Sequence, residues 1–252
     1  MKEFEQLRQL AVEIAQAAGA LLAERPDVFD INQKSSAVDF ATQMDIAAEK
    51  LIVDRILTAR PNDGIIGEEG SERASTSGIT WVIDPLDGTV NYFYGIPGWN
   101  VSIAAKNSEG VVAGAVYSPT TQSLWSASLG GGATFNGKKI ACNDPVALDR
   151  AMLATGFSYD LEERKSQGAM VASLLPRVRD FRRNGAAAVD LCYVAMGALD
   201  GYFEAGLKEW DLAAGGLIAQ EAGAIVSGGP SSGQPVIAAG PALHAVLSRE
   251  IL

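Results

Sequence analysis

Acidic side chains gather in three short segments of the chain, each beside apolar or aromatic residues. The segments are IIGEEG (65–70), WVIDPLDGTVNY (81–92) and EWDLAAGG (209–216). The middle segment ends an apolar run with Asp84 and Asp87, although a simple turn could use Asn-Gly or Pro-Gly and avoid their repulsion. Any one of these acids could be surface charge or a helix N-cap. Their repetition at three segment ends favours a common role in chemistry.

A divalent metal ion would relieve the repulsion between these carboxylates. Magnesium takes about six oxygen ligands, of which several are commonly water and the rest come from carboxylates and substrate phosphate. Asp84 and Asp87 can face one centre across the Pro-Leu turn, and the carbonyl of Leu86 can turn inward between them. Gly88 and Thr89 follow at once, where the start of a helix would favour a phosphate. We therefore predict a site at which metal ions and a phosphate meet.

Chemistry that depends on histidine or cysteine is poorly supported. His244 is the only histidine and lies among the last nine residues, where we expect it on the surface of a terminal helix. A His-based triad and a histidine zinc site are therefore disfavoured. Cys142 and Cys192 have no metal-ligand spacing and form no disulfide framework, so we expect buried or incidental thiols. Carboxylates, hydroxyls and hard metal ions would have to carry the chemistry of an enzyme.

One further segment matches a nucleotide-binding signature. GATFNGKK (132–139) fits the pattern GxxxxGK, but Lys139 stands where a P-loop needs a Ser or Thr hydroxyl. Asn136-Gly137, in the same segment, is a strong signal for a hairpin turn. We therefore predict a β-hairpin here and no P-loop.

The composition predicts a globular protein with a large core. The chain has 252 residues, 48% of them hydrophobic, which suits one large domain or two closely joined halves. Its net charge of −10 disfavours nucleic acid or an anionic membrane as the main partner. The N-terminus shows no secretory signal, and no apolar stretch of about 20 residues could span a membrane, so we expect a cytoplasmic protein.

Hydrophobic spacing predicts the elements that position the acidic segments. In the first half, helical spacing indicates helices at 4–23 and about 45–59, with an exposed irregular loop at 32–45 between them. Alternation then predicts strands that are mostly antiparallel. These strands are 79–84, 100–107, 111–118, 123–128 and 132–140.

The second half alternates strands and helices. The expected strands are 152–157, 180–185, 200–206, 224–228 and 235–240. The expected helices are 166–178, 186–198, 211–222 and a last helix at the C-terminus. This order favours an α/β fold, with an α+β first half and an α/β second half that pack together without a flexible linker.

The three acidic segments resemble the signature segments of the inositol monophosphatase family of magnesium-dependent, lithium-sensitive phosphatases. The resemblance spans nearly the whole chain, including KSSAVDFATQMD (34–45) and FRRNGAAAVDLCYVAMGALDGYFEAG (181–206), and is closest to the bacterial branch. It implies a layered αβαβα sandwich of the inositol monophosphatase and fructose-1,6-bisphosphatase type. It also implies a single phosphatase unit over 1–252, with an α+β half at 1–145 and an α/β half at 146–252.

The resemblance implies a set of metal ligands. Glu68, Asp84 and the carbonyl of Leu86 would hold the first magnesium ion, and Asp84, Asp87 and Asp211 would hold the second. Two or three ions are expected in all. Manganese is a possible substitute, and lithium is expected to inhibit.

The resemblance also implies the residues that act on the substrate. The catalytic residues would be Glu68, Thr89 and Asp45, with Thr89 and Asp45 orienting the attacking water so that no phospho-enzyme forms. Lys34 matches a loop lysine near the phosphate. The substrate-binding residues would be Asp87, Gly88, Thr89, Arg183, Gly185, Ala186, Ala187, Glu204 and Asp211.

The implied activity is hydrolysis of myo-inositol 1-phosphate or a similar small polyol phosphate by a cytoplasmic homodimer. Relatives also hydrolyse histidinol phosphate, fructose 1,6-bisphosphate or phosphoadenosine phosphate. Glu204 favours a neutral polyol, because a carboxylate accepts hydrogen bonds from hydroxyls and repels a second phosphate, although it could attract the amine of histidinol phosphate. Ala186, where many relatives have Ser or Thr, and Val90, where Thr is frequent, leave substrate choice open.

Simpler roles for these residues remain possible at this point. Arg183 could be a surface or dimer-interface arginine, and Glu204 could pair locally. A regulatory or binding protein on the phosphatase fold is the alternative from a different class, because a fold does not fix a function. The complete ligand set favours the enzyme, since a scaffold would have no need of it.

Overall fold

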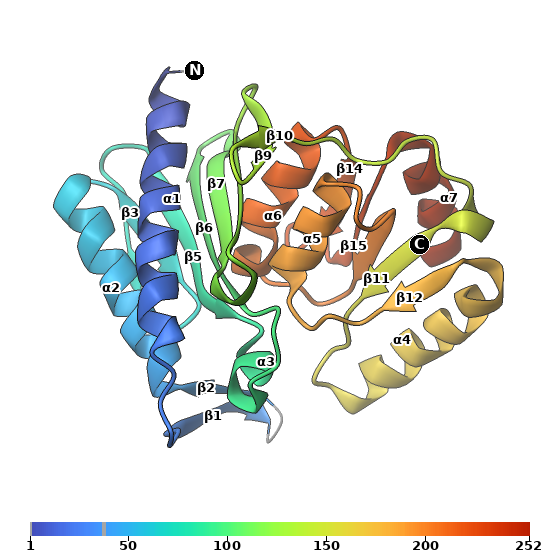
Figure 1. Cartoon of the computed structure of the whole chain (residues 1–252), viewed down its shortest axis with the longest axis horizontal. Coiled ribbons are helices and arrows are strands. Elements are labelled where there is room, and N and C mark those ends of the chain that lie inside the picture. The colour runs from blue at the N-terminus through green and yellow to red at the C-terminus, as the bar shows by residue number, and fades with distance from the viewer. Residues whose placement is uncertain (1, 37–38) are drawn as a thin grey trace.

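The computed structural model describes residues 2–36 and 39–252 and arranges them in five layers (Figure 1). Helices α1 (Lys2–Ala23) and α2 (Gln43–Ala59) cover the outer face of an eight-stranded sheet. Helices α5 (Ala187–Ala195) and α6 (Glu209–Glu221) form the middle layer. A five-stranded sheet follows, and its outer face carries α4 (Leu161–Leu174) and α7 (Pro241–Ile251). The predicted αβαβα sandwich is confirmed.

The eight-stranded sheet is built by the first half of the chain. Its order is β10 (Lys138–Lys139), β9 (Gly132–Phe135), β8 (Ser123–Ser128), β7 (Gly110–Ser118), β6 (Asn100–Asn107), β5 (Thr80–Asp87), β3 (Gly64–Gly67), β4 (Glu72–Arg73). Neighbouring strands are antiparallel except β3 and β5, which are parallel. Asn136 and Gly137 between β9 and β10 both have positive φ, as a type I′ turn requires. The predicted hairpin is therefore confirmed at the P-loop-like segment.

The five-stranded sheet is built by the second half. Its order is β12 (Asp180–Arg182), β11 (Met152–Thr155), β13 (Gly201–Glu204), β15 (Gln234–Ala239), β14 (Ile225–Gly229). Strand β11 is parallel to both β12 and β13, whereas β15 is antiparallel to its two neighbours. The carboxyl ends of β11 and β13 therefore lie side by side, a position at which α/β sheets commonly place ligands.

Helix α4 lies earlier in the chain than the prediction of 166–178. It begins at Leu161 because the Asp160 carboxylate accepts hydrogen bonds from the backbone N–H groups of the first turn. Pro176 cannot donate a backbone hydrogen bond, and the α-helix gives way to a 3₁₀ turn at Leu175–Arg177. Two other 3₁₀ turns lie at Pro119–Thr121 and Leu148–Arg150.

Small residues let α6 approach both the first sheet and α5. An added methyl carbon at Gly215 in α6 would lie 2.9 Å from Leu191 Cβ in α5. One at Gly114 in β7 would lie 3.0 Å from Ala214 Cα in α6. This close packing brings Asp211, in the first turn of α6, toward the acidic end of β5.

The predicted loop at 32–45 is wrong. The chain forms an antiparallel hairpin of β1 (Ile31–Ser36) and β2 (Asp39–Thr42), and α2 begins directly after it. Ala37 and Val38, which the prediction included, lie outside the described residues. Residues 31–34 of β1 are all exposed, which hides the alternation that identifies a half-buried strand.

The environment of His244 also differs from the prediction. It lies on α7 as expected, but only 9% of the residue is exposed, because this face of α7 packs onto β14 and β15. Its Nε2 lies 2.8 Å from Ser227 Oγ. Cys192 is buried and Cys142 half-buried, and both are free thiols as predicted. Within the described residues, we find no helix with the length and apolar character needed to cross a membrane.

Candidate active site

The segment 84–89 forms a turn at the end of β5. The strand continues to Asp87, beyond the predicted end at 84, but its pairing with β6 shifts register between Asp84 and Asp87. Inside this bulge the Leu86 N–H donates to Asp84 Oδ1 over 3.0 Å. Gly88 then has a φ of 86°, which glycine adopts without strain, and the short helix α3 (Thr89–Tyr94) begins.

Four carboxylates from three parts of the chain meet at this turn. Only 1% of Asp84 is exposed, and burial raises the pKa of its carboxyl well above the usual range. The charges of Glu68, Asp87 and Asp211 raise that pKa further, which shows that all four groups share one electrostatic environment. Burial likewise raises the pKa of Asp211 well above its usual value, although the backbone N–H of Lys208 donates to Asp211 Oδ2 over 2.7 Å.

Asp87 is the best hydrogen-bonded member of this group. Its Oδ2 accepts from Asn100 Nδ2 at 2.8 Å and from the backbone N–H of Ala188 at 2.9 Å. Burial raises the pKa of Asp87 to about 6, and the same two hydrogen bonds oppose that rise. Because Asn100 lies in β6 and Ala188 in α5, Asp87 ties the first sheet to the middle layer.

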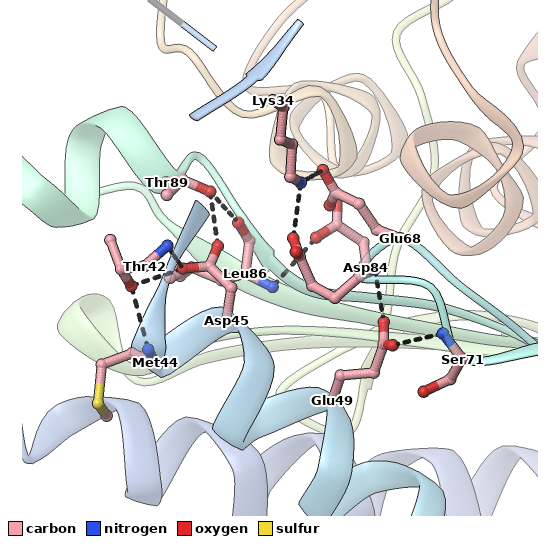
Figure 2. A network of polar contacts seen from close by, with 11 residues as sticks. Lys34, Thr42, Met44, Asp45, Glu49, Glu68, Ser71, Asp84, Leu86 and Thr89 are labelled. Carbon is pink, nitrogen blue, oxygen red and sulfur yellow. Dashed lines mark hydrogen bonds and ion pairs between the residues drawn. The ribbon is translucent and has the colours of Figure 1, made fainter. Parts of the chain in front are cut away.

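Lys34 supplies positive charge at the edge of the cluster (Figure 2). Its Nζ lies 2.8 Å from Glu68 Oε1 and 2.6 Å from Glu69 Oε1. Burial lowers the pKa of Lys34, but the charge of Glu68 and the hydrogen bonds to both glutamates raise it overall. Burial raises the pKa of Glu69 to about 7. Lys34, expected near a phosphate, therefore pairs here with acidic side chains of the 68–69 turn.

The donor set suits a hard divalent cation. Its side chains offer only carboxylate oxygens, the preferred ligands of magnesium, and two of the four, Asp84 and Asp87, are buried. As the side chains stand, no three acidic, histidine or cysteine groups among residues 2–36 and 39–252 are arranged around one metal position. Glu68 faces Lys34 and Asp87 faces Asn100 and Ala188. Metal binding would therefore require these side chains to turn toward a common centre.

Thr89 and Asp45 meet beside this cluster (Figure 2). Thr89 Oγ1 lies 2.9 Å from Asp45 Oδ1 and 3.0 Å from the carbonyl oxygen of Leu86. Asp45 is held from its other side by Thr42, whose hydroxyl and N–H donate to Oδ2 at 2.6 and 2.8 Å. The bond from the Thr42 N–H, together with the Thr42 hydroxyl oxygen that accepts from the backbone of the first turn, forms a capping box at the start of α2. The two residues predicted to orient water are thus in direct contact.

Glu49 is a functional candidate that the sequence analysis missed. It is 3% exposed, on the inner face of α2, and its two carboxylate oxygens accept from the backbone N–H groups of Glu69 and Ser71 at 2.9 Å each. An added methyl carbon at Gly67 would lie 2.4 Å from Glu49 Oε2, so the turn closes onto this carboxylate (Figure 2). Glu49 therefore holds the turn that carries Glu68. The sequence feature that could have identified Glu49 is an acidic residue at helical spacing from the apolar residues on the buried face of α2.

We expect Glu49→Gln to loosen this turn. The amide would replace one acceptor with a donor that faces a backbone N–H, which should lower the free energy of unfolding by about 1–3 kcal/mol. Manganese affinity, measured by calorimetry, should fall as well, because Glu68 would no longer be held in place. Glu13→Gln on the exposed face of α1 is the matched control. An unchanged manganese affinity would mean that Glu49 only stabilises the fold.

The predicted substrate wall at 183–187 lies against the turn at the end of β5. An added methyl carbon at Gly88 would lie 3.3 Å from both Ala186 Cβ and the carbonyl oxygen of Gly185. Gly185 has a φ of 86°, and a side chain there would overlap the guanidinium of Arg183. Ala187 begins α5. The structure therefore brings the wall and the candidate phosphate position together.

Three polar residues that the sequence analysis missed hold this wall. Asn91 Nδ2, in α3, donates to the carbonyl of Asn184 at 2.7 Å, and Asn184 Nδ2 donates to Asp190 Oδ1 at 2.5 Å. Asp190 lies on the buried face of α5, and burial raises its pKa to about 8. The only sequence signal was an acid within the otherwise apolar run AAAVDLCYVA, which by itself specifies no partner.

Glu204 ends β13 and faces the same space. Burial raises the pKa of Glu204, the hydrogen bond from Tyr202 and the charge of Arg183 oppose that rise, and the charge of Asp87 adds to it. Glu204 in turn raises the pKa of Asp211. Glu204 therefore lies within electrostatic reach of the carboxylate cluster, and Arg183 lies within reach of Glu204.

The chain is similar to one known protein family over nearly its whole length. A family model described as "Inositol monophosphatase family" matches residues 3–249. "Inositol-1-monophosphatase" of Mycobacterium leprae is 42% identical, over 97% of this chain and 94% of that protein. "Nus factor SuhB" of Escherichia coli (strain K12) is 43% identical, over 86% of this chain and 83% of that protein. The crystal structure of extragenic suppressor protein suhB from Bartonella henselae has a TM-score of 0.92 at 32% identity and covers 98% of both chains.

Proposed function

The chain belongs to the inositol monophosphatase family, and on this premise we propose that it is a magnesium-dependent phosphomonoesterase acting on myo-inositol 1-phosphate or a similar small polyol phosphate. The observation that carries the proposal is the group of buried Asp84 and Asp87 with half-buried Glu68 and Asp211, which lies beside the Thr89–Asp45 pair. We propose that residues 1–252 act as one unit, since both halves contribute carboxylates.

In the proposed mechanism, Glu68, Asp84, the Leu86 carbonyl, Asp87 and Asp211 would hold the metal ions. Bound magnesium would supply hydroxide at neutral pH and stabilise the leaving oxygen in an in-line displacement. The chain's own residues would orient the reactants.

Thr89 and Asp45 would act on the attacking water. When the Thr89 hydroxyl donates a hydrogen bond to Asp45 Oδ1, the lone pairs of Oγ1 are free to accept a hydrogen bond from the water and so aim its oxygen at phosphorus. The backbone N–H groups of Gly88 and Thr89 would contact the phosphate. No side chain needs to become phosphorylated in this scheme.

The proposed substrate preference depends on the wall opposite the metal site. Glu204 would accept a hydrogen bond from a sugar-ring hydroxyl, and its charge would oppose a second phosphate. Arg183 would lie beside it. Ala186 is 3% exposed and offers no hydroxyl, so Arg183 and Glu204 would supply the polar contacts that this wall makes to the substrate. Histidinol phosphate, through its amine, and fructose 1,6-bisphosphate are the alternatives within the family.

A panel of phosphate esters tests this preference. We expect phosphate release from myo-inositol 1-phosphate to exceed that from histidinol phosphate, fructose 1,6-bisphosphate and 2′-AMP in the presence of magnesium. Activity should vanish with a chelator, return with magnesium or manganese, and fall with millimolar lithium. A preference for histidinol phosphate would place the enzyme in a different metabolic role and contradict the polyol assignment.

The name of the Escherichia coli relative, Nus factor SuhB, favours a regulatory function as the second candidate. Such a function would not depend on the carboxylate cluster. Loss of phosphate release from every ester in the panel, by a folded protein loaded with magnesium, would favour it. We propose that the active form is a cytoplasmic homodimer. Light scattering on the purified protein would test the dimer, and cell fractionation would test the location.

A further inference from the structure

Glu204 lies where two parallel strands end. Strands β11 and β13 pair in parallel with Thr155 opposite Phe203, so the next residues along the chain, Gly156 and Glu204, also lie beside each other. The Glu204 side chain is therefore placed by the sheet, and its carboxylate lies against two residues, Tyr202 in β13 and Gly156 directly after β11.

Because Gly156 has no side chain, the Glu204 carboxylate can occupy the space beside its Cα. An added methyl carbon at this position would lie 2.0 Å from Glu204 Oε2 and 2.2 Å from Oε1. Gly156 is not among the glycines with positive φ, so its backbone conformation is open to other residues. The lack of a side chain at 156 is therefore explained by the position of the Glu204 carboxylate.

Tyr202 fixes the carboxylate from another side. Side chains two residues apart on a strand point to the same face, and the Tyr202 hydroxyl donates to Glu204 Oε2 over 2.5 Å. Tyr202 has an exposed fraction of 0%, and a buried tyrosine hydroxyl requires a partner. The bond engages Oε2 and leaves the lone pairs of Oε1 for another donor.

We propose that Gly156 and Tyr202 are positioning residues that hold the Glu204 carboxylate so that it can accept a hydrogen bond from a ring hydroxyl of the substrate. This inference rests on the proposed function, because the proposed function assigns recognition of a substrate ring hydroxyl to Glu204. It adds that recognition of the polyol depends on a carboxylate held between a glycine and a buried tyrosine.

Two substitutions move the carboxylate in different ways. Tyr202→Phe removes the donor and keeps the ring, whereas Gly156→Ala pushes the flexible end of Glu204 out of its place without changing the backbone. With myo-inositol 1-phosphate we expect each to lower kcat/KM by about tenfold, mainly through KM, since the lost interaction orients the substrate. With 4-nitrophenyl phosphate, which has no ring hydroxyl, the loss should be much smaller.

Tyr193→Phe is the matched control. Tyr193 lies in the middle layer, packs edge to face on Trp125 at 5.8 Å, and its hydroxyl has no hydrogen bond to a described residue. It should leave kcat/KM unchanged for both esters. Melting temperatures of all variants, measured without substrate, show whether the fold is kept. If Tyr202→Phe fails to fold, Gly156→Ala carries the test alone.

A double-mutant cycle with Glu204→Ala gives the decisive result. If Gly156 and Tyr202 act through the carboxylate, neither substitution should lower kcat/KM for myo-inositol 1-phosphate further once Glu204 is alanine. Additive losses would overturn the inference, as would equal losses on both esters. If the wild-type enzyme hydrolyses myo-inositol 1-phosphate and both variants have the same kcat/KM as the wild type, only the positioning role is overturned. A wild type inactive on that ester overturns the proposed function and the recognition role with it.

Discussion

Asp84→Asn is expected to abolish turnover while the fold is kept. Asp84 is the ligand that both metal ions would share, so loss of its charge should lower kcat more than the roughly 10²–10³-fold cost of removing one oxyanion-hole donor. The asparagine carbonyl can still accept the Leu86 N–H that now bonds Asp84 Oδ1 at 3.0 Å. The effect should therefore be on chemistry and on metal binding.

The same substitution should raise the stability of the metal-free protein. Burial and the charges of Glu68, Asp87 and Asp211 raise the pKa of Asp84, which means that its ionised form is disfavoured in the folded state without metal. A neutral asparagine removes this repulsion. Wild type should gain melting temperature on addition of manganese, whereas the variant should gain much less.

Asp149→Asn, at an exposed position, is the control for a general change of charge. It should retain wild-type turnover and the wild-type shift of melting temperature with manganese. Full activity of Asp84→Asn, or an undiminished response of its melting temperature to manganese, would refute the proposed ligand set.

The fold was predictable for elements whose apolar residues follow a clear strand or helix period in the sequence. Strand β6 has the predicted bounds 100–107, and α1 and α2 begin within two residues of the predicted starts. Such elements carry their own periodicity in sequence. The β1–β2 hairpin was missed because most of its residues are exposed or half-exposed, so no alternation marks it. The start of α4 was missed because it depends on Asp160, a local cap inside a polar stretch.

The candidate site was predictable for residues that lie within short motifs. The acids at 68, 84, 87 and 211 stand out because charge directly follows or adjoins apolar segments. Residues that hold those motifs in place were not predictable. Glu49 bonds a turn about 20 residues away, and Asp190 acts through Asn184 on a residue of α3. Such contacts exist only after the chain has folded, and one sequence contains no record of them.

Thr89→Ala is expected to lower kcat by about 10²–10⁴-fold, the range typical of general acid–base groups, because the Thr89–Asp45 pair would no longer orient the water; KM should change little. Thr89 is a cleaner probe of the proposed water-orienting pair than Asp45, because Asp45 also caps α2 through Thr42. The methyl group of alanine keeps helix α3 but offers no oxygen to the water. Single-turnover measurements at saturating magnesium would assign the loss to the chemical step.

Thr89→Ser separates the hydroxyl from the rest of the side chain. Serine restores Oγ within reach of Asp45 Oδ1, which lies 2.9 Å from the threonine hydroxyl, so most of the wild-type kcat should return. Thr58→Ala, at an exposed position late in α2, is the control and should leave kcat unchanged. The proposed role requires the alanine variant to be slow and the serine variant fast. A serine variant as slow as alanine would show that the methyl group's packing, and not the hydroxyl, is what turnover needs.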